Sequence, residues 1–142
     1  MIFFESFENR IIIWHSFREK LETDNDPISS VIQFWNKAPI SPRTCDPFDP
    51  STWLKAWDLI EENQYCEFSK ILAIYYTLSL TKRFEESYFE IQVVNDPLEH
   101  ELKYLLVVDH LVIGYKYDTA ILTLDLPKNI RIQASYCLPF DS

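Results

Sequence analysis

The spacing of apolar residues along the chain changes once, near residue 84. Before that point apolar side chains recur every three or four residues, the spacing that puts them on one face of an α-helix. After it they recur about every second residue, as in a β-strand with one buried face. The sequence therefore predicts helices first and strands second, which is the arrangement of an α+β fold.

Four helices are expected in the first part of the chain, over residues 7 to about 22, 27–38, 50 to about 62 and about 65–82. Ser6, Asp26 and Asp49 precede three of them as N-cap residues, because their side-chain oxygens can accept hydrogen bonds from the first unpaired backbone N–H groups. The fourth helix is apolar on most sides and is therefore the predicted central one.

Five short strands are expected in the second part, over residues 88–95, 101–109, 111–117, 120–126 and 130–136. Their close spacing, with no helix between them, indicates an antiparallel meander. We expect the N-terminal helices to pack on one face of this C-terminal meander, so that residues 1–142 form a single α+β domain.

The composition excludes several function classes. Gly114 is the single glycine, whereas phosphate-binding loops, dinucleotide-binding turns and nucleophile elbows need glycines where the backbone turns tightly. The net charge of −9 repels the phosphate backbone, so no nucleic-acid partner is expected. The apolar run of residues 71–80 is too short to span a bilayer, so no membrane partner is expected either.

Cys45, Cys66 and Cys137 form an odd set without the C-x-x-C spacing of redox or zinc motifs. They indicate reduced thiols and, with no signal peptide visible, predict a cytoplasmic protein. No metal site and no cofactor are expected, because no pair of cysteines or histidines has the local spacing of metal ligands.

Cys66 offers one catalytic alternative to a binding function. It is expected in the first turn of the fourth helix, where unpaired N–H groups and the helix dipole lower the pKa of a thiol. His100 and His110 follow on or between the strands, and they are followed or flanked by Asp109, Asp118 and Asp125. Papain-like peptidases share this order, in which a cysteine opens a helix and is followed by a histidine and an acid on later strands. The alternative that the chain is a small hydrolase using Cys66 therefore stays open.

A metal-dependent nuclease is the second catalytic alternative. Asp96, Glu101 and Lys103 lie around one predicted hairpin, and Glu61 or Glu62 from the third helix could join them. Carboxylates on a hairpin can hold Mg²⁺ while a lysine assists the attacking water. An acidic chain lacks the positive groove that DNA cleavage needs, so we prefer to interpret Glu101 and Lys103 as the solvent face of an alternating strand.

The segment of residues 45–60 gathers prolines, Phe48 and two of the four tryptophans. Trp53 and Trp57, four residues apart in the predicted third helix, form an apolar ridge that must be buried in a core or against a partner. We expect Phe48, Trp53, Trp57 and the separate Trp35 to lie at, or directly behind, a protein contact.

Three features follow one another between residues 49 and 66. The first is a D-P-x-T-W run at residues 49–53, and the second is Trp57 with an acidic and an apolar neighbour. The third is the pair Tyr65-Cys66, which stands before an apolar helix. Over about residues 46–80 this resembles small uncharacterised proteins of tailed bacteriophages, in particular T4-like phages of marine bacteria. Leu54 and Asp58 stand where that pattern has proline and glutamate. The resemblance implies a phage protein, in the cytoplasm of the infected cell or in the virion, and implies no activity.

These observations together predict a non-catalytic, phage-type protein-interaction module. It would be a virion or assembly component or a host-directed factor, and it would bind a protein partner or a second copy of itself. The prediction rests on missing catalytic motifs and on an acidic chain rich in aromatic residues.

Overall fold

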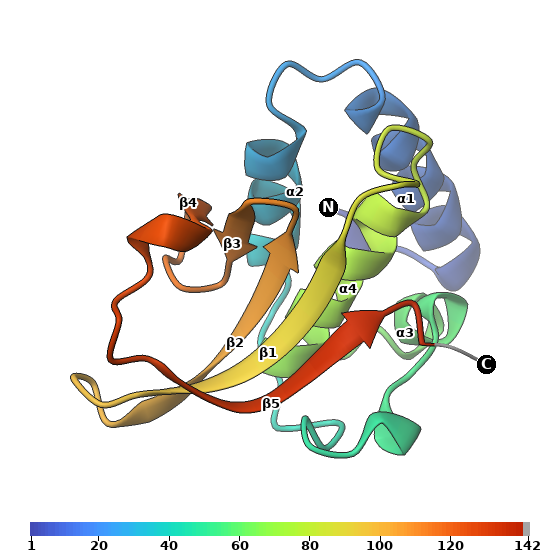
Figure 1. Cartoon of the computed structure of the whole chain (residues 1–142). Coiled ribbons are helices and arrows are strands. Elements are labelled where there is room, and N and C mark those ends of the chain that lie inside the picture. Colours follow the sequence, from blue (N-terminus) through green and yellow to red (C-terminus); the bar gives the residue numbers. More distant parts are fainter. Residues whose placement is uncertain (141–142) are drawn as a thin grey trace. The chain divides into compact units, whose positions relative to one another are not determined.

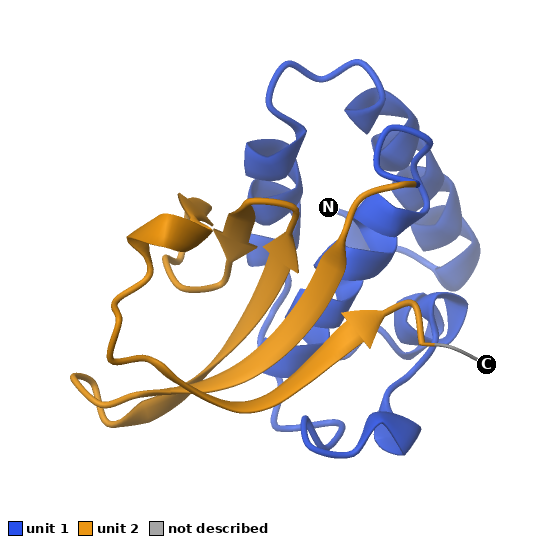
Figure 2. Cartoon of the chain, in the orientation of Figure 1, with its two compact units in different colours: residues 1–85 blue, residues 86–142 orange. Residues whose placement is uncertain are grey.

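The structure, a computed structural model, describes residues 1–140. The chain divides into two compact units, unit 1 (Met1–Glu85) and unit 2 (Glu86–Ser142), coloured separately in Figure 2. Helices make up unit 1 and an antiparallel sheet makes up most of unit 2, so the predicted α+β class is confirmed. The packing of the helices on one sheet face and the single domain over residues 1–142 stay predictions.

Unit 1 contains four α-helices, α1 (Phe7–Leu21), α2 (Pro27–Asn36), α3 (Ala56–Glu62) and α4 (Glu67–Ser79), and two 3₁₀ turns, η1 (Ile2–Phe4) and η2 (Pro50–Thr52) (Figure 1). The predicted N-caps of the first two helices are confirmed. Ser6 accepts from the backbone N–H of Asn9, and Asp26 accepts from that of Ser29. None of the helices among residues 1–140 has the length and hydropathy needed to cross a membrane.

The third helix is shorter than predicted, and that prediction was wrong in extent. Asp49 caps only the turn η2, and the backbone is extended at Trp53 and again at Lys55. Helix α3 therefore starts six residues after Pro50, at Ala56. In place of the predicted continuous helix, residues 50–62 form a short turn, an extended stretch and then a short helix.

Side-chain hydrogen bonds cause this interruption. The Thr52 hydroxyl accepts from the backbone N–H of Asp46 and donates to the carbonyl oxygen of Asp49. The indole N–H of Trp53 donates to the carbonyl oxygen of Asp46, at 2.8 Å. These bonds compete with helical ones and close a compact loop, the 46–53 loop. Trp53 and Trp57 consequently do not share one helix face.

The core of unit 1 is centred on the hydroxyl of Thr77 in α4. The indole N–H groups of Trp14 in α1 and of Trp35 in α2 both donate to this oxygen, each over 2.9 Å. Thr77 donates its own proton to the carbonyl oxygen of Ala73, at 2.7 Å. Because a buried polar group without a partner is costly, this hydroxyl ties α1 and α2 to α4. We call Trp14, Trp35 and Thr77 the Thr77 hub.

Unit 2 is built on a five-stranded antiparallel sheet with the strand order β4-β3-β2-β1-β5 (Figure 1). The strands are β1 (Phe89–Asp96), β2 (Glu101–Val108), β3 (Leu111–Ile113), β4 (Ile121–Leu122) and β5 (Arg131–Leu138). The first four follow one another as a meander. The predicted meander is wrong for the last strand, since β5 pairs with β1 and not with β4. The alternation of apolar residues specifies which face of a strand is buried and not which strand lies beside it.

Strands β3 and β4 are shorter than predicted, because much of this segment packs onto the sheet. Four partly buried side chains cover a buried apolar patch: Tyr115, Ile121, Leu126 and Ile130 lie against Val94, Leu105, Val107 and Val112. A 3₁₀ turn, η3 (Thr123–Asp125), interrupts the segment. Apolar residues that read as alternating strand positions thus form a small core within unit 2.

Candidate protein-interaction site

Trp57 is the most exposed of the tryptophans, with 49% of its surface accessible. One edge of its ring packs on Trp14, with centroids 5.1 Å apart and an interplanar angle of 77°. Arg18 lies over both rings, its guanidinium carbon 4.3 Å from the Trp14 centroid and 5.4 Å from the Trp57 centroid. Cation–π attraction and ring packing therefore hold the exposed indole in place. We call Trp14, Arg18 and Trp57 the Trp57 platform.

The guanidinium of Arg18 is held by ring packing, not by an ion pair. Among the described residues no carboxylate forms a salt bridge with it, and its buried Nε atom has no hydrogen-bond partner. Burial lowers the pKa of Arg18, an effect that the neighbouring Glu19 carboxylate partly offsets. Arginine stays charged at neutral pH, so this half-buried cation retains donors that an oxygen of another molecule can satisfy.

Arg10 fixes α3, and with it Trp57, against α1. Its guanidinium donates to the carbonyl oxygens of Ile60 and Glu61, at 3.1 Å each, and to that of Glu5, at 2.6 Å. Helix α3 has seven residues, and so short a helix is not stable alone. Arg10 satisfies two carbonyl groups at its C-terminal end and thereby makes the platform a firm surface.

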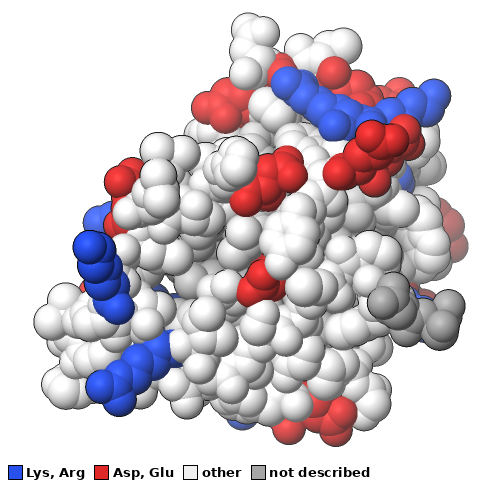
Figure 3. Space-filling view, viewed as in Figure 1, with Lys and Arg blue, Asp and Glu red and all other residues white. Residues whose placement is uncertain are grey.

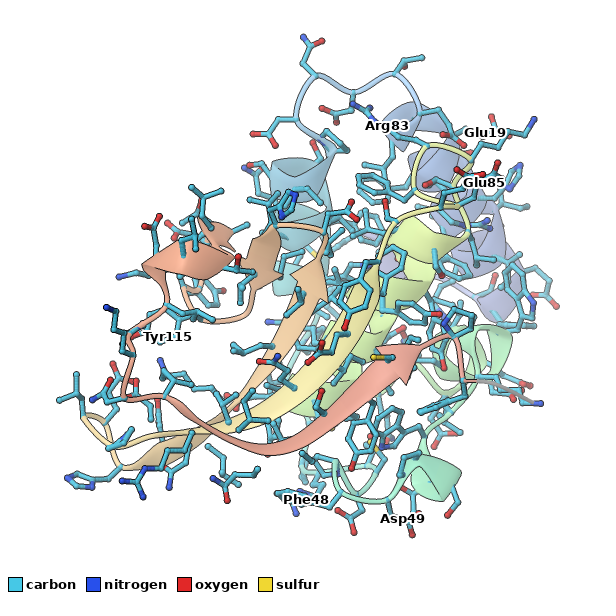
Figure 4. All side chains as sticks on the ribbon, viewed as in Figure 1. Glu19, Phe48, Asp49, Arg83, Glu85 and Tyr115 are labelled. Atoms are coloured by element: carbon cyan, nitrogen blue, oxygen red, sulfur yellow. The ribbon has the colours of Figure 1, made fainter. Side chains whose placement is uncertain are left out.

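Phe48 belongs to the 46–53 loop and is 47% exposed (Figure 4). Its backbone N–H donates to the Asp46 carboxylate, at 2.9 Å. Trp53, at the other end of the loop, is partly buried and packs on Phe68 of α4, with centroids 4.9 Å apart. Trp53 therefore fastens the loop to the helices, and Phe48 is the aromatic side chain that the loop presents.

Trp35 lies inside unit 1 with no accessible surface. Its ring contacts Phe3, Phe34 and Tyr65 in one aromatic cluster. Of the four side chains predicted near a protein contact, Phe48 and Trp57 are at the surface, Trp53 is partly buried and Trp35 is in the core. The contact itself stays a prediction.

The sequence pattern did not single out Trp14 and Arg18. Their spacing of four residues puts them on one face of α1, where an indole and a guanidinium commonly meet. Nothing in that spacing says that α3 lies beside the same face. The sequence therefore contained a signal for the contact between Trp14 and Arg18. It contained none for the contact of these two residues with Trp57.

Cys66 is the N-cap residue of α4. Its sulfur accepts from the backbone N–H of Ser69 at 3.4 Å, while the Ser69 hydroxyl accepts from the N–H of Cys66 at 2.8 Å. This reciprocal arrangement is a capping box. The same sulfur also contacts the Thr44 hydroxyl, at 3.5 Å, and Cys45 is the next residue after Thr44. None of these contacting groups is an imidazole.

The histidines lie elsewhere in the two units. His15 in unit 1 is exposed on α1, with its Nε2 atom 2.6 Å from the Glu19 carboxylate. His100 and His110 are exposed in the β1–β2 and β2–β3 turns of unit 2. Within the described part of unit 1, the contacts of Cys66 thus supply no base for a hydrolase.

Asp96, Glu101 and Lys103 do lie together, in the β1–β2 hairpin. Asp96 stands opposite Glu101 in the strand register, but it is buried and its carboxylate accepts from the backbone N–H of Leu98. The Lys103 ammonium lies 2.9 Å from Glu99 and 3.7 Å from Glu101, so it is engaged by carboxylates. Over residues 1–140, no group of three or more His, Cys, Asp or Glu side chains is placed to hold a metal ion.

The chain matches no protein-family model, and comparisons with curated proteins and with solved structures find no match either. No relative therefore supplies an activity, a substrate or a partner. The ground for a functional proposal is the geometry of the chain's own residues.

Proposed function

We propose that the chain is a non-catalytic protein-interaction module whose main contact is the Trp57 platform. The observation that carries the proposal is a half-exposed indole held firmly by Trp14 and Arg18. Trp and Arg are enriched among the residues that dominate binding energy at protein interfaces. A side chain that is already ordered loses little conformational entropy when a partner covers it, so its burial contributes more to affinity.

The platform fits a protein surface of a definite kind. The indole of Trp57 needs an apolar hollow, and Arg18 needs a carboxylate or carbonyl oxygen beside that hollow. The indole N–H groups of the other three tryptophans have acceptors within unit 1, whereas that of Trp57 has none among the described residues. An acceptor atom on the partner would form a hydrogen bond with the indole N–H of Trp57. Phe48 would add a second apolar contact.

The distribution of charge supports a protein in preference to a nucleic acid as partner. The chain carries a net charge of −9. On the face shown in Figure 3, basic side chains form small separate groups, some of them beside acidic ones. A nucleic-acid groove needs several cations in a row, and the platform offers Arg18 alone.

The segment around Trp57 is also the one that resembles proteins of tailed bacteriophages. We therefore propose that the module acts in the infected bacterial cell or in the virion, as an assembly component, a virion part or a host-directed factor. Its partner would be a phage protein, a host protein or a second copy of the chain.

The test compares protein capture by matched baits in lysates of phage-infected bacteria. The baits are the tagged wild type, Trp57→Ala, Phe48→Ala and the control Tyr117→Ala, and captured proteins are quantified by mass spectrometry. Tyr117 is 73% exposed and belongs to unit 2, so its loss removes exposed aromatic surface without changing any of the proposed contact residues. Sedimentation of the purified chains measures self-association in parallel.

We expect at least one protein to be retained by the wild type and by Tyr117→Ala, and to fall about tenfold or more with Trp57→Ala. Phe48→Ala should reduce capture less. If instead the wild type self-associates and Trp57→Ala does not, the partner is a second copy. Capture and self-association that are the same for Trp57→Ala and wild type would reject the platform as the contact. Recovery of the chain in purified particles would select a virion component over a host-directed factor.

A further inference from the structure

Cys45 and Cys66 are neighbours in space although they are distant in sequence. The segment after α2 runs beside the start of α4, where the backbone N–H of Ser41 donates to the carbonyl oxygen of Tyr65 at 2.9 Å. Cys45 follows Thr44 directly in this irregular segment, which brings its thiol close to the sulfur of Cys66. The Thr44 hydroxyl, 3.5 Å from the same sulfur, is a second contact between the two segments.

The surroundings of Cys66 favour a thiolate. The hydrogen bond from Cys45 lowers the pKa of Cys66 well below its usual range, burial acts in the opposite direction, and bonds from Ser69 and Thr44 add to the lowering. The N-terminal end of α4 contributes favourable dipole charge. The same bond to Cys66 raises the pKa of Cys45. The two shifts run in opposite directions, so deprotonation is favoured at Cys66 and disfavoured at Cys45.

We propose that Cys45 and Cys66 form a reversible redox pair, in which hydrogen peroxide oxidises Cys66 and Cys45 then closes a disulfide with it. This modification site is separate from the Trp57 platform and does not depend on the binding function. Cys66 is 5% exposed, so a small oxidant suits it better than a bulky disulfide. Cys45 is partly exposed and lies outside regular secondary structure, which lets it approach the shorter distance of an S–S bond.

The chemistry balances in two steps. The Cys66 thiolate attacks one oxygen of the peroxide, the O–O bond breaks, and the departing hydroxide becomes water by taking from solvent the proton that Cys66 released on ionising, which leaves a sulfenic acid on Cys66. The Cys45 sulfur then attacks the Cys66 sulfur, the S–O bond breaks, and the second water leaves with the proton of Cys45. Two thiols and one peroxide thus give one disulfide and two waters, and a thiol reductant reverses the result by exchange.

A purely structural role for Cys66 makes a different prediction. As the N-cap of α4, the sulfur would only accept the hydrogen bond of the Ser69 N–H, and it would not be oxidised faster than other thiols. Cys137, exposed in unit 2, is the internal comparison because it lies outside the pair. The two roles are therefore separated by which cysteine reacts first and by what it becomes.

The experiment treats the reduced full-length chain with hydrogen peroxide, blocks the remaining thiols with a maleimide, and maps the peptides by mass spectrometry. Wild type and Cys137→Ser should give a peptide pair linked through Cys45 and Cys66, in a monomer, that dithiothreitol separates again. Cys45→Ser should give no such link and should accumulate a Cys66 sulfenic acid that dimedone traps. Oxidation of Cys66 should be about tenfold or more faster than that of Cys137, because the surroundings of Cys66 lower the pKa of its thiol.

Three results would overturn the proposal: no Cys45–Cys66 link in wild type, oxidation of Cys137 before Cys66, or a link that dithiothreitol does not open. The wild type and Cys137→Ser decide the matter even if Cys45→Ser fails to fold, since neither changes a residue of the pair. Circular dichroism of each chain before treatment shows whether it is folded.

Discussion

The Thr77 hub and the Trp57 platform use the same kind of side chain in opposite ways, and Trp14 belongs to both. In the hub, two indoles from different helices share one buried hydroxyl and are at most 1% exposed. In the platform, Trp57 packs on Trp14 and keeps about half of its surface in solvent. The difference shows that an indole is fully buried where the core offers an acceptor for its N–H, and stays at the surface where it packs without one.

Thr77→Val should have the largest effect, because it removes the acceptor that two indoles share while it preserves the shape of the side chain. Each buried N–H left without a partner costs about 1–3 kcal/mol, so the free energy of unfolding should fall by roughly 2–5 kcal/mol. Urea unfolding followed by tryptophan fluorescence measures the change.

Thr81→Val is the matched control for that change. Thr81 is also buried, but its hydroxyl donates to the carbonyl oxygen of Leu78, accepts from the backbone N–H of Phe84 and bonds to no indole. We expect this variant to lose about 1 kcal/mol. Equal losses for the two valine variants would show that the hub is not what secures the helices.

Trp35→Phe should come next, with a loss of about 1–3 kcal/mol from the smaller ring in a closed core. Because Trp35 and Thr77 act through one hydrogen bond, the double variant with Thr77→Val should lose less than the sum of the two single losses. A double-mutant cycle of urea midpoints and slopes measures this coupling. Strict additivity would mean that Trp35 contributes through packing alone.

Trp57→Ala should affect partner binding more than stability, unlike the core variants Thr77→Val and Trp35→Phe. We expect a loss of only about 1 kcal/mol in unfolding free energy, because half of the ring is already in solvent, together with a loss of roughly tenfold or more in partner binding. The contrast with Trp35→Phe sharpens the comparison between core and surface. A stability loss as large as that of Thr77→Val would instead make Trp57 a core residue.

Arg18→Gln should have the smallest effect on stability, within about 1 kcal/mol, because a partly exposed cation–π contact contributes little. It should weaken partner binding and should also reduce the dependence of binding on salt, since it removes the charge that faces the partner. Titrations at two salt concentrations measure both effects. Unchanged salt dependence would assign to Arg18 a packing role only.

The amino-acid sequence by itself determined the features that depend on neighbours along the chain. The caps Ser6 and Asp26, the change from helical to strand spacing, and the limits of the β1–β2 hairpin all follow from residues within a few positions of one another. Even locally, the 46–53 loop was missed, because side-chain bonds from Thr52 and Trp53 outcompeted a helical pattern that the spacing of the tryptophans suggested.

The tertiary structure alone decided which side chains meet across long stretches of sequence. It buried Trp35 on Thr77, left Trp57 at the surface beside Arg18, returned β5 to the side of β1, and brought Cys45 to Cys66. The apolar pattern predicts that a side chain is buried, but it does not predict which distant residue packs against it. That choice depends on where a hydrogen-bond partner and free volume happen to lie once the helices and strands have packed, which only the three-dimensional arrangement contains.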